Sequence, residues 1–130
     1  MIHRVLNIGR WVVDFLFSTT EYDVEGVLAC LYDAYAPKRV MERAMGMMKS
    51  GGANTGFTYT NPKLLRAVVA IGPTTSGKEF IDTFVHEIHH LAVAIADNLG
   101  MDLEGEAPAY ISGDAARALA EVICALGCGQ

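Results

Sequence analysis

The chain has 130 residues, a net charge of −5 at neutral pH and 52% hydrophobic residues. This length suits one domain spanning residues 1–130, and this hydrophobic content favours a packed core over disorder. The acidic balance argues against nucleic acid or an anionic membrane as a partner, and no apolar run approaches the length of a membrane span.

The N-terminal half predicts strands followed by two helices. Residues 2–17 are largely apolar and predict one or two strands, with Gly9 as a turn or bulge. A helical stripe follows over residues 23–35, and Pro37 ends that helix and can begin a second one. Residues 50–54 predict a flexible loop.

The second half predicts two more strands and two more helices. Residues 55–60 combine threonine with aromatic residues and residues 64–71 are mostly apolar, which is typical of strands. Helices are predicted over residues 80–97 and 108–126. We therefore expect an α+β fold in which a small, mainly antiparallel sheet packs on helices.

The three cysteines, Cys30, Cys124 and Cys128, bear on the compartment. An odd number without an evident signal peptide predicts reduced thiols and a cytoplasmic protein. Cys124 and Cys128 lie four residues apart and would suit a metal, but free cysteines more often behave as small apolar core residues.

The helix over residues 80–97 has the strongest periodicity. Ser76 and Glu79 precede it in a capping-box pattern. Ile81, Val85 and Ala92 widen its apolar stripe, so we expect burial on most of its circumference. The stripe itself recurs at spacings of three or four: Phe80, Phe84, Ile88, Leu91, Ile95 and Leu99.

The centre of this helix carries the motif H-E-x-x-H. His86 and His90 share one helical face, so both rings can reach one metal ion. Glu87 lies about 100° further round, where its carboxylate can reach a water without binding the metal. Hydrolytic zinc requires this arrangement. The alternative is two core histidines bonded to the backbone, which the complete motif on a well-supported helix disfavours. His89 points away from the shared face.

A catalytic zinc usually has three protein ligands and one open position, so a third ligand is needed. Asp102, Glu104 and Glu106 follow the motif closely. Glu106 is the favoured ligand because it begins the last predicted helix, where a side chain is held rigidly, and Glu104 is the alternative. An acidic residue in a first helical turn also suits the helix dipole, which alone would explain it. Tyr110 lies one turn after Glu106.

Together these features resemble the gluzincin branch of zinc metallopeptidases, and the small size is similar to the single-domain minigluzincins. The likeness covers residues 64–126, about half of the chain. It implies a zincin-like fold in which His86, His90 and Glu106 bind zinc, Glu87 polarises the attacking water and Tyr110 stabilises the oxyanion. It also implies that the strand ending near Ile71 borders the cleft and receives an extended peptide by strand addition.

The residues support the same chemistry without the family. Zinc lowers the pKa of water to about 7, and Glu87 can move the proton from that water to the leaving amine. Tyr110 and Arg66 are candidate donors to the developing oxyanion. We therefore predict a zinc-dependent metallopeptidase acting on a peptide or protein substrate. The alternative is a metallopeptidase-like zinc-binding module that binds a peptide or protein with little or no hydrolysis.

A competing motif lies just before the helix. Residues 72–78 match most of a phosphate-binding P-loop and follow an apolar strand. Glu79, however, occupies the position where that loop needs Ser or Thr to hold magnesium. The remaining chain, about fifty residues, is short for the parallel sheet of a nucleotide-binding domain. We therefore favour the helix cap over nucleotide binding.

Overall fold

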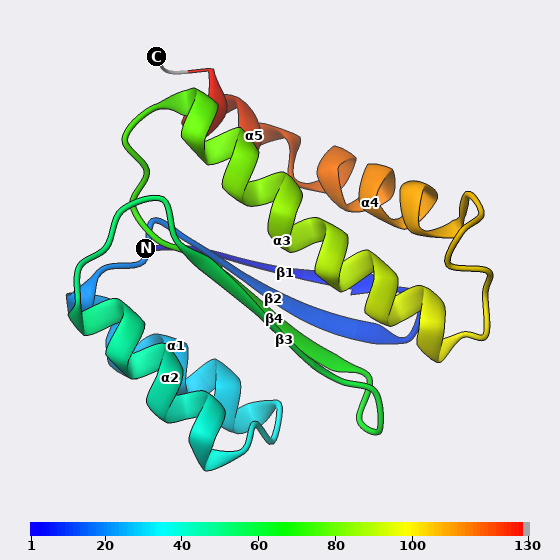
Figure 1. The fold of residues 1–130 in the computed structure, drawn as a ribbon, viewed down its shortest axis with the longest axis horizontal. Coiled ribbons are helices and arrows are strands. Elements are labelled where there is room, and N and C mark those ends of the chain that lie inside the picture. Colours follow the sequence, from blue (N-terminus) through cyan, green and yellow to red (C-terminus); the bar gives the residue numbers. More distant parts are fainter. Residues whose placement is uncertain (129–130) are drawn as a thin grey trace.

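A four-stranded sheet in the order β1-β2-β4-β3 separates two helical layers in the computed structural model, which describes residues 1–128 (Figure 1). The β1–β2 and β3–β4 pairs are antiparallel, and the central β2–β4 pair is parallel. The predicted α+β class with a mainly antiparallel sheet is therefore confirmed. The strands are β1 (Ile2–Ile8), β2 (Trp11–Phe17), β3 (Gly56–Asn61) and β4 (Arg66–Ile71).

The two central strands are buried on both faces because helices cover each side. Side chains alternate along a strand, so neighbouring residues enter different cores. On one face, Phe15, Phe17 and Val69 pack with the long helix α3 (Gly77–Asn98). On the other face, Leu16 and Val68 pack with the first two helices. Strands buried on both faces read as nearly continuous apolar runs, as β2 does apart from Asp14.

The predicted turn at Gly9 joins β1 to β2. Gly9 has φ of +59°, in the left-handed region where glycine carries no steric penalty. Ile8 pairs with Trp11, so the connection is a two-residue hairpin loop. Residues 2–17 therefore form two strands.

The first two helices, α1 (Val24–Asp33) and α2 (Lys38–Lys49), lie where the sequence predicts them and follow a short 3₁₀ turn, η1 (Glu21–Asp23). Pro37 is the N-cap residue of α2, as expected from its lack of an N–H group. The pair covers one face of the sheet.

The helix α3 (Gly77–Asn98) crosses the opposite face of the sheet. Its cap is confirmed in part, because the Ser76 hydroxyl accepts a hydrogen bond from the Glu79 N–H at 3.2 Å. The expectation of burial on most of its circumference is wrong. Ile81 and Val85, predicted to widen the buried stripe, are 39% and 55% exposed. Within residues 1–128, no helix is both long and apolar enough to cross a lipid bilayer.

The last predicted helix is two helices, α4 (Ala107–Ala118) and α5 (Ala120–Gly127). The chain bends at Leu119, whose N–H is shared between the carbonyl groups of Ala115 and Ala116. The bend leaves both Leu119 and Val122 buried, 1% and 2% exposed, where a straight helix would diverge from the core.

The end of α5 covers the first turn of α3. A β-carbon at Gly77 would overlap the backbone carbonyl of Gly127, so the backbones of the two helices meet here without an intervening side chain. A P-loop needs open space at this helix terminus for a phosphate. The Gly127 backbone lies against Gly77, at the start of α3.

Candidate metal centre

His86 and His90 face each other on the exposed side of α3. Their Nε2 atoms are 3.2 Å apart, and the ring planes are nearly perpendicular, at 81°. Both side chains are exposed. The four-residue spacing therefore places the two ring nitrogens next to each other, as the helical geometry predicts.

This separation fits a shared zinc ion. Two imidazole nitrogens at about 2.0–2.1 Å from a tetrahedral zinc lie roughly 3.3 Å from each other. The 3.2 Å separation of the Nε2 atoms needs almost no rearrangement. A hydrogen bond between two neutral rings suits the same distance, so the neighbouring groups must distinguish the two interpretations.

Glu87 is the neighbouring group, and it is 5% exposed. The Thr58 hydroxyl donates to Glu87 Oε1 at 2.9 Å, and it also lies 3.2 Å from the Glu87 carbonyl oxygen. Gly56 makes room for the carboxylate, since a β-carbon there would lie 3.3 Å from Oε2. Burying a carboxylate is costly unless it is hydrogen-bonded, and the Thr58 hydroxyl supplies one such bond to Glu87.

The three motif residues line a polar cleft of about 430 Å³ between α3 and β3. Its walls are Gly56, Thr58 and Thr60 from the strand and His86, Glu87 and His90 from the helix. A second hollow of about 370 Å³ shares Gly56, His86 and Glu87 with it and continues past Thr55 and Asp82. The histidine pair therefore opens into an extended cleft.

The strand beside this cleft is β3. It pairs on one side only within residues 1–128, with β4. The expectation that the strand ending near Ile71 receives a peptide is therefore wrong. That strand is β4, and its hydrogen-bonding positions are used by β2 and β3. The free edge bordering the histidines belongs to β3.

The structure does not bring Glu106 to the histidine pair. The Tyr110 hydroxyl donates to Glu106 Oε2 at 3.1 Å, one turn along α4. Figure 1 shows α4 beside α3, on the side away from β3. Within residues 1–128, one group of potential metal ligands has three side chains with atoms within 4.8 Å of one another. It contains neither Glu106 nor the two histidines of the motif. Glu104 is also outside any such group with the histidines, so the third ligand stays a prediction.

Two other residues named from the sequence lie away from the cleft. Arg66 is not an oxyanion donor, because its side chain leaves the opposite face of β4 and its guanidinium lies 3.5 Å from Asp14. His89 is exposed, and its ring centroid is 6.2 Å from that of His90. Its position agrees with the expectation that it does not share the face of the pair.

Sequence reasoning missed Gly56 and Thr58. The signal for them is the alternation in β3, where small or hydroxyl residues at 56, 58 and 60 face the cleft and Phe57 and Tyr59 face the other core. That alternation identifies one polar face but says nothing of which helix it meets.

Comparisons with protein-family models, with characterised proteins and with solved structures found no match for this chain. Function is therefore inferred from the geometry of the cleft.

Replacing Thr58 by valine is expected to destabilise the protein. The substitution keeps the shape of the side chain and removes the donor to a buried carboxylate, which costs about 1–3 kcal/mol. Chemical denaturation measures this change. Thr60→Val is the matched control, because Thr60 lies on the same strand and lines the same cleft. Equal free energies of unfolding for the two variants would show that the Thr58–Glu87 bond does not stabilise the fold.

Proposed function

We propose that this chain is a zinc-dependent peptidase that hydrolyses peptide bonds with water as the nucleophile. The observation that carries the proposal is the exposed His86–His90 pair, with Nε2 atoms 3.2 Å apart, next to the buried Glu87 carboxylate. Two core histidines would be buried and bonded to the backbone, and these are exposed and aimed at each other.

A zinc ion at the pair would polarise the substrate carbonyl and make water acidic enough to ionise near neutral pH. Glu87 then acts as the general base and acid. Thr58 holds its Oε1, and within residues 1–128 Oε2 receives no hydrogen bond, so Oε2 can accept the proton from the attacking water. The same carboxyl group delivers that proton to the leaving nitrogen as the bond to carbon breaks.

The free edge of β3 supports an extended peptide as the substrate. An edge strand presents unpaired N–H and C=O groups, to which a peptide can add as a further strand. A peptide along β3 passes the residues that line the cleft, Gly56 and Thr58 among them. Its carbonyl groups would then lie above the histidine pair.

Glu106 remains the proposed third ligand, and Tyr110 the proposed oxyanion donor. Residues 97–106 are exposed throughout, and the proposal requires this segment to carry Glu106 around α3 to the side that faces β3. In the proposal, the Glu106 carboxylate leaves the Tyr110 hydroxyl when it binds the metal. That hydroxyl is then free to donate to the substrate oxygen.

The second candidate is a zinc-binding module that holds a peptide on β3 without cutting it. The present position of Glu106, bonded to Tyr110, favours this candidate because the Tyr110 hydroxyl, the proposed oxyanion donor, is then not available for hydrolysis. The buried Glu87 favours the peptidase, because a site used only for binding has no need of a base.

A peptide-library digest tests the proposal. The zinc-loaded protein is incubated with a diverse library, and new termini are identified by mass spectrometry. We expect cleavage that a chelator abolishes and added zinc restores. Uncut peptides that co-purify with the zinc-loaded protein, and no new termini, would contradict the peptidase and favour the binding module.

A further inference from the structure

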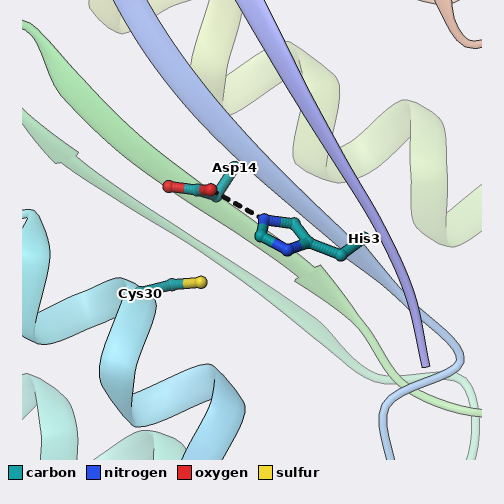
Figure 2. A group of neighbouring side chains, drawn as sticks. All are labelled: His3, Asp14 and Cys30. Carbon is teal, nitrogen blue, oxygen red and sulfur yellow. Dashed lines mark hydrogen bonds and ion pairs between the residues drawn. The ribbon is translucent and has the colours of Figure 1, made fainter.

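A second cluster of metal-binding side chains lies on the opposite face of the sheet. His3 comes from the edge strand β1, Asp14 from β2 and Cys30 from α1. Figure 2 shows the imidazole, the carboxylate and the thiol converging on one space between the sheet and α1. One potential ligand atom from each residue lies within 4.8 Å of the others. These residues belong to neither the H-E-x-x-H cleft nor the proposed hydrolysis.

Asp14 is the centre of this cluster. It is 6% exposed, and it interrupts the otherwise apolar strand β2. Its Oδ1 lies 2.7 Å from His3 Nε2, and its Oδ2 lies 3.5 Å from the Arg66 guanidinium. The arginine therefore fixes one oxygen of the carboxylate and leaves the other directed at His3, on the side where Cys30 lies.

The site is open to solvent from the side of the edge strand. The His3 side chain is 42% exposed, whereas that of Asp14 is 9% exposed. Donor atoms around a tetrahedral zinc lie roughly 3–4 Å apart. The three ligand atoms already lie within 4.8 Å of one another, and the 2.7 Å between His3 Nε2 and Asp14 Oδ1 has to widen slightly. The exposed His3 ring can make that movement without disturbing the core.

We propose that His3, Asp14 and Cys30 form a second metal site, for zinc, that ties β1 and α1 to the centre of the sheet. Imidazole and thiolate are the donors that a borderline-soft ion such as zinc prefers, and a carboxylate completes sets of this kind. On binding, the Cys30 thiol loses its proton to solvent and binds as the thiolate, His3 binds through a neutral ring nitrogen, and water occupies the fourth position.

A nucleophilic cysteine is the competing interpretation of the same three residues. Burial, with the nearby Asp14 and Asp33 carboxylates, raises the pKa of the Cys30 thiol to about 11, against a smaller lowering effect of Arg66. Without metal the thiol is therefore protonated at neutral pH and is a poor nucleophile. A bound cation reverses this, because a coordinating thiol is deprotonated outright.

Titration with cobalt(II), a spectroscopic substitute for zinc, tests the site. Cys124→Ser/Cys128→Ser leaves Cys30 as the single thiol, and both removed thiols are exposed. We expect a thiolate-to-cobalt charge-transfer band that saturates within two equivalents, because the cleft histidines can take up cobalt as well, and that zinc displaces. Adding Cys30→Ser should abolish the band, and adding His3→Ala should weaken cobalt binding at least tenfold. No band, a band that survives Cys30→Ser, or a cobalt affinity that His3→Ala leaves unchanged would overturn the proposal.

The double variant His86→Ala/His90→Ala separates this site from the candidate peptidase centre. It removes both histidines of the cleft and leaves Cys30 in place, so the charge-transfer band should be unchanged. Only the second site contains a thiol, so the charge-transfer band reports metal binding at that site. The result does not depend on whether the cleft binds a metal.

Discussion

Glu87→Gln is expected to bind zinc as the wild type does and to lose hydrolysis by about 10²–10⁴-fold. The amide has the size of the carboxylate, and its oxygen can still accept from Thr58, which donates to Glu87 Oε1 at 2.9 Å. It cannot accept a proton from water at neutral pH. The measurement is the initial rate of cleavage of one library-derived peptide, together with the zinc content of the same sample.

Glu79→Gln is the matched control for this variant. Glu79 is an exposed glutamate in the first turn of α3, two turns before the cleft. It should cleave at the wild-type rate. Unchanged cleavage by Glu87→Gln would show that the hydrolysis does not occur at this centre, and loss of zinc would show that Glu87 is a ligand instead of the base.

Each of the substitutions His86→Ala, His90→Ala and Glu106→Gln is expected to weaken zinc binding at the cleft by at least tenfold, since losing even an outer-shell partner typically costs about 10–100-fold. Competition with a chelating dye measures the affinity. Using the Cys30→Ser background removes the thiol of the second site, so that the titration reports the cleft alone.

Two matched controls accompany these variants. His89→Ala removes an exposed histidine adjacent to His90 on the same helix, and Glu104→Gln removes the acidic residue two positions before Glu106. Neither should change the zinc affinity. If Glu106→Gln matches the wild type while Glu104→Gln does not, Glu104 is the third ligand. If His89→Ala alone loses zinc, the helical face assigned to the site is wrong.

The motif helix and its two histidines were predictable because their geometry is local. A spacing of four residues places His86 above His90 wherever the helix forms, and the apolar periodicity from Phe80 to Ile95 requires a helix. The cap at Ser76 is likewise a matter of adjacent residues. None of these features depends on what the helix packs against.

The neighbours of the motif were not predictable because they depend on strand order. The sequence predicts a strand over residues 64–71, but its central place in the sheet follows from parallel pairing with β2, a distant segment. The cleft therefore borders β3, and Arg66 points to the opposite face. The bend at Leu119 escaped prediction for a similar reason, since no glycine or proline marks it and packing against α3 decides it.

The second cluster has no sequence motif at all. Its members come from β1, β2 and α1, and their spacings of 11 and 16 residues match no ligand pattern. The available signal was Asp14 itself, a carboxylate within the apolar strand Trp11–Phe17. A buried charge predicts a partner, but only the fold reveals that His3 and Arg66 supply it.

Zinc content of the Cys30→Ser chain, purified without added metal, tests the central claim most directly. This variant lacks the thiol of the second site and retains His86, Glu87 and His90. Elemental analysis should find one zinc per chain, which His86→Ala/His90→Ala in the same background should lose. A Cys30→Ser chain that contains no zinc, and takes up none when zinc is added at neutral pH, would contradict a metal centre in the cleft.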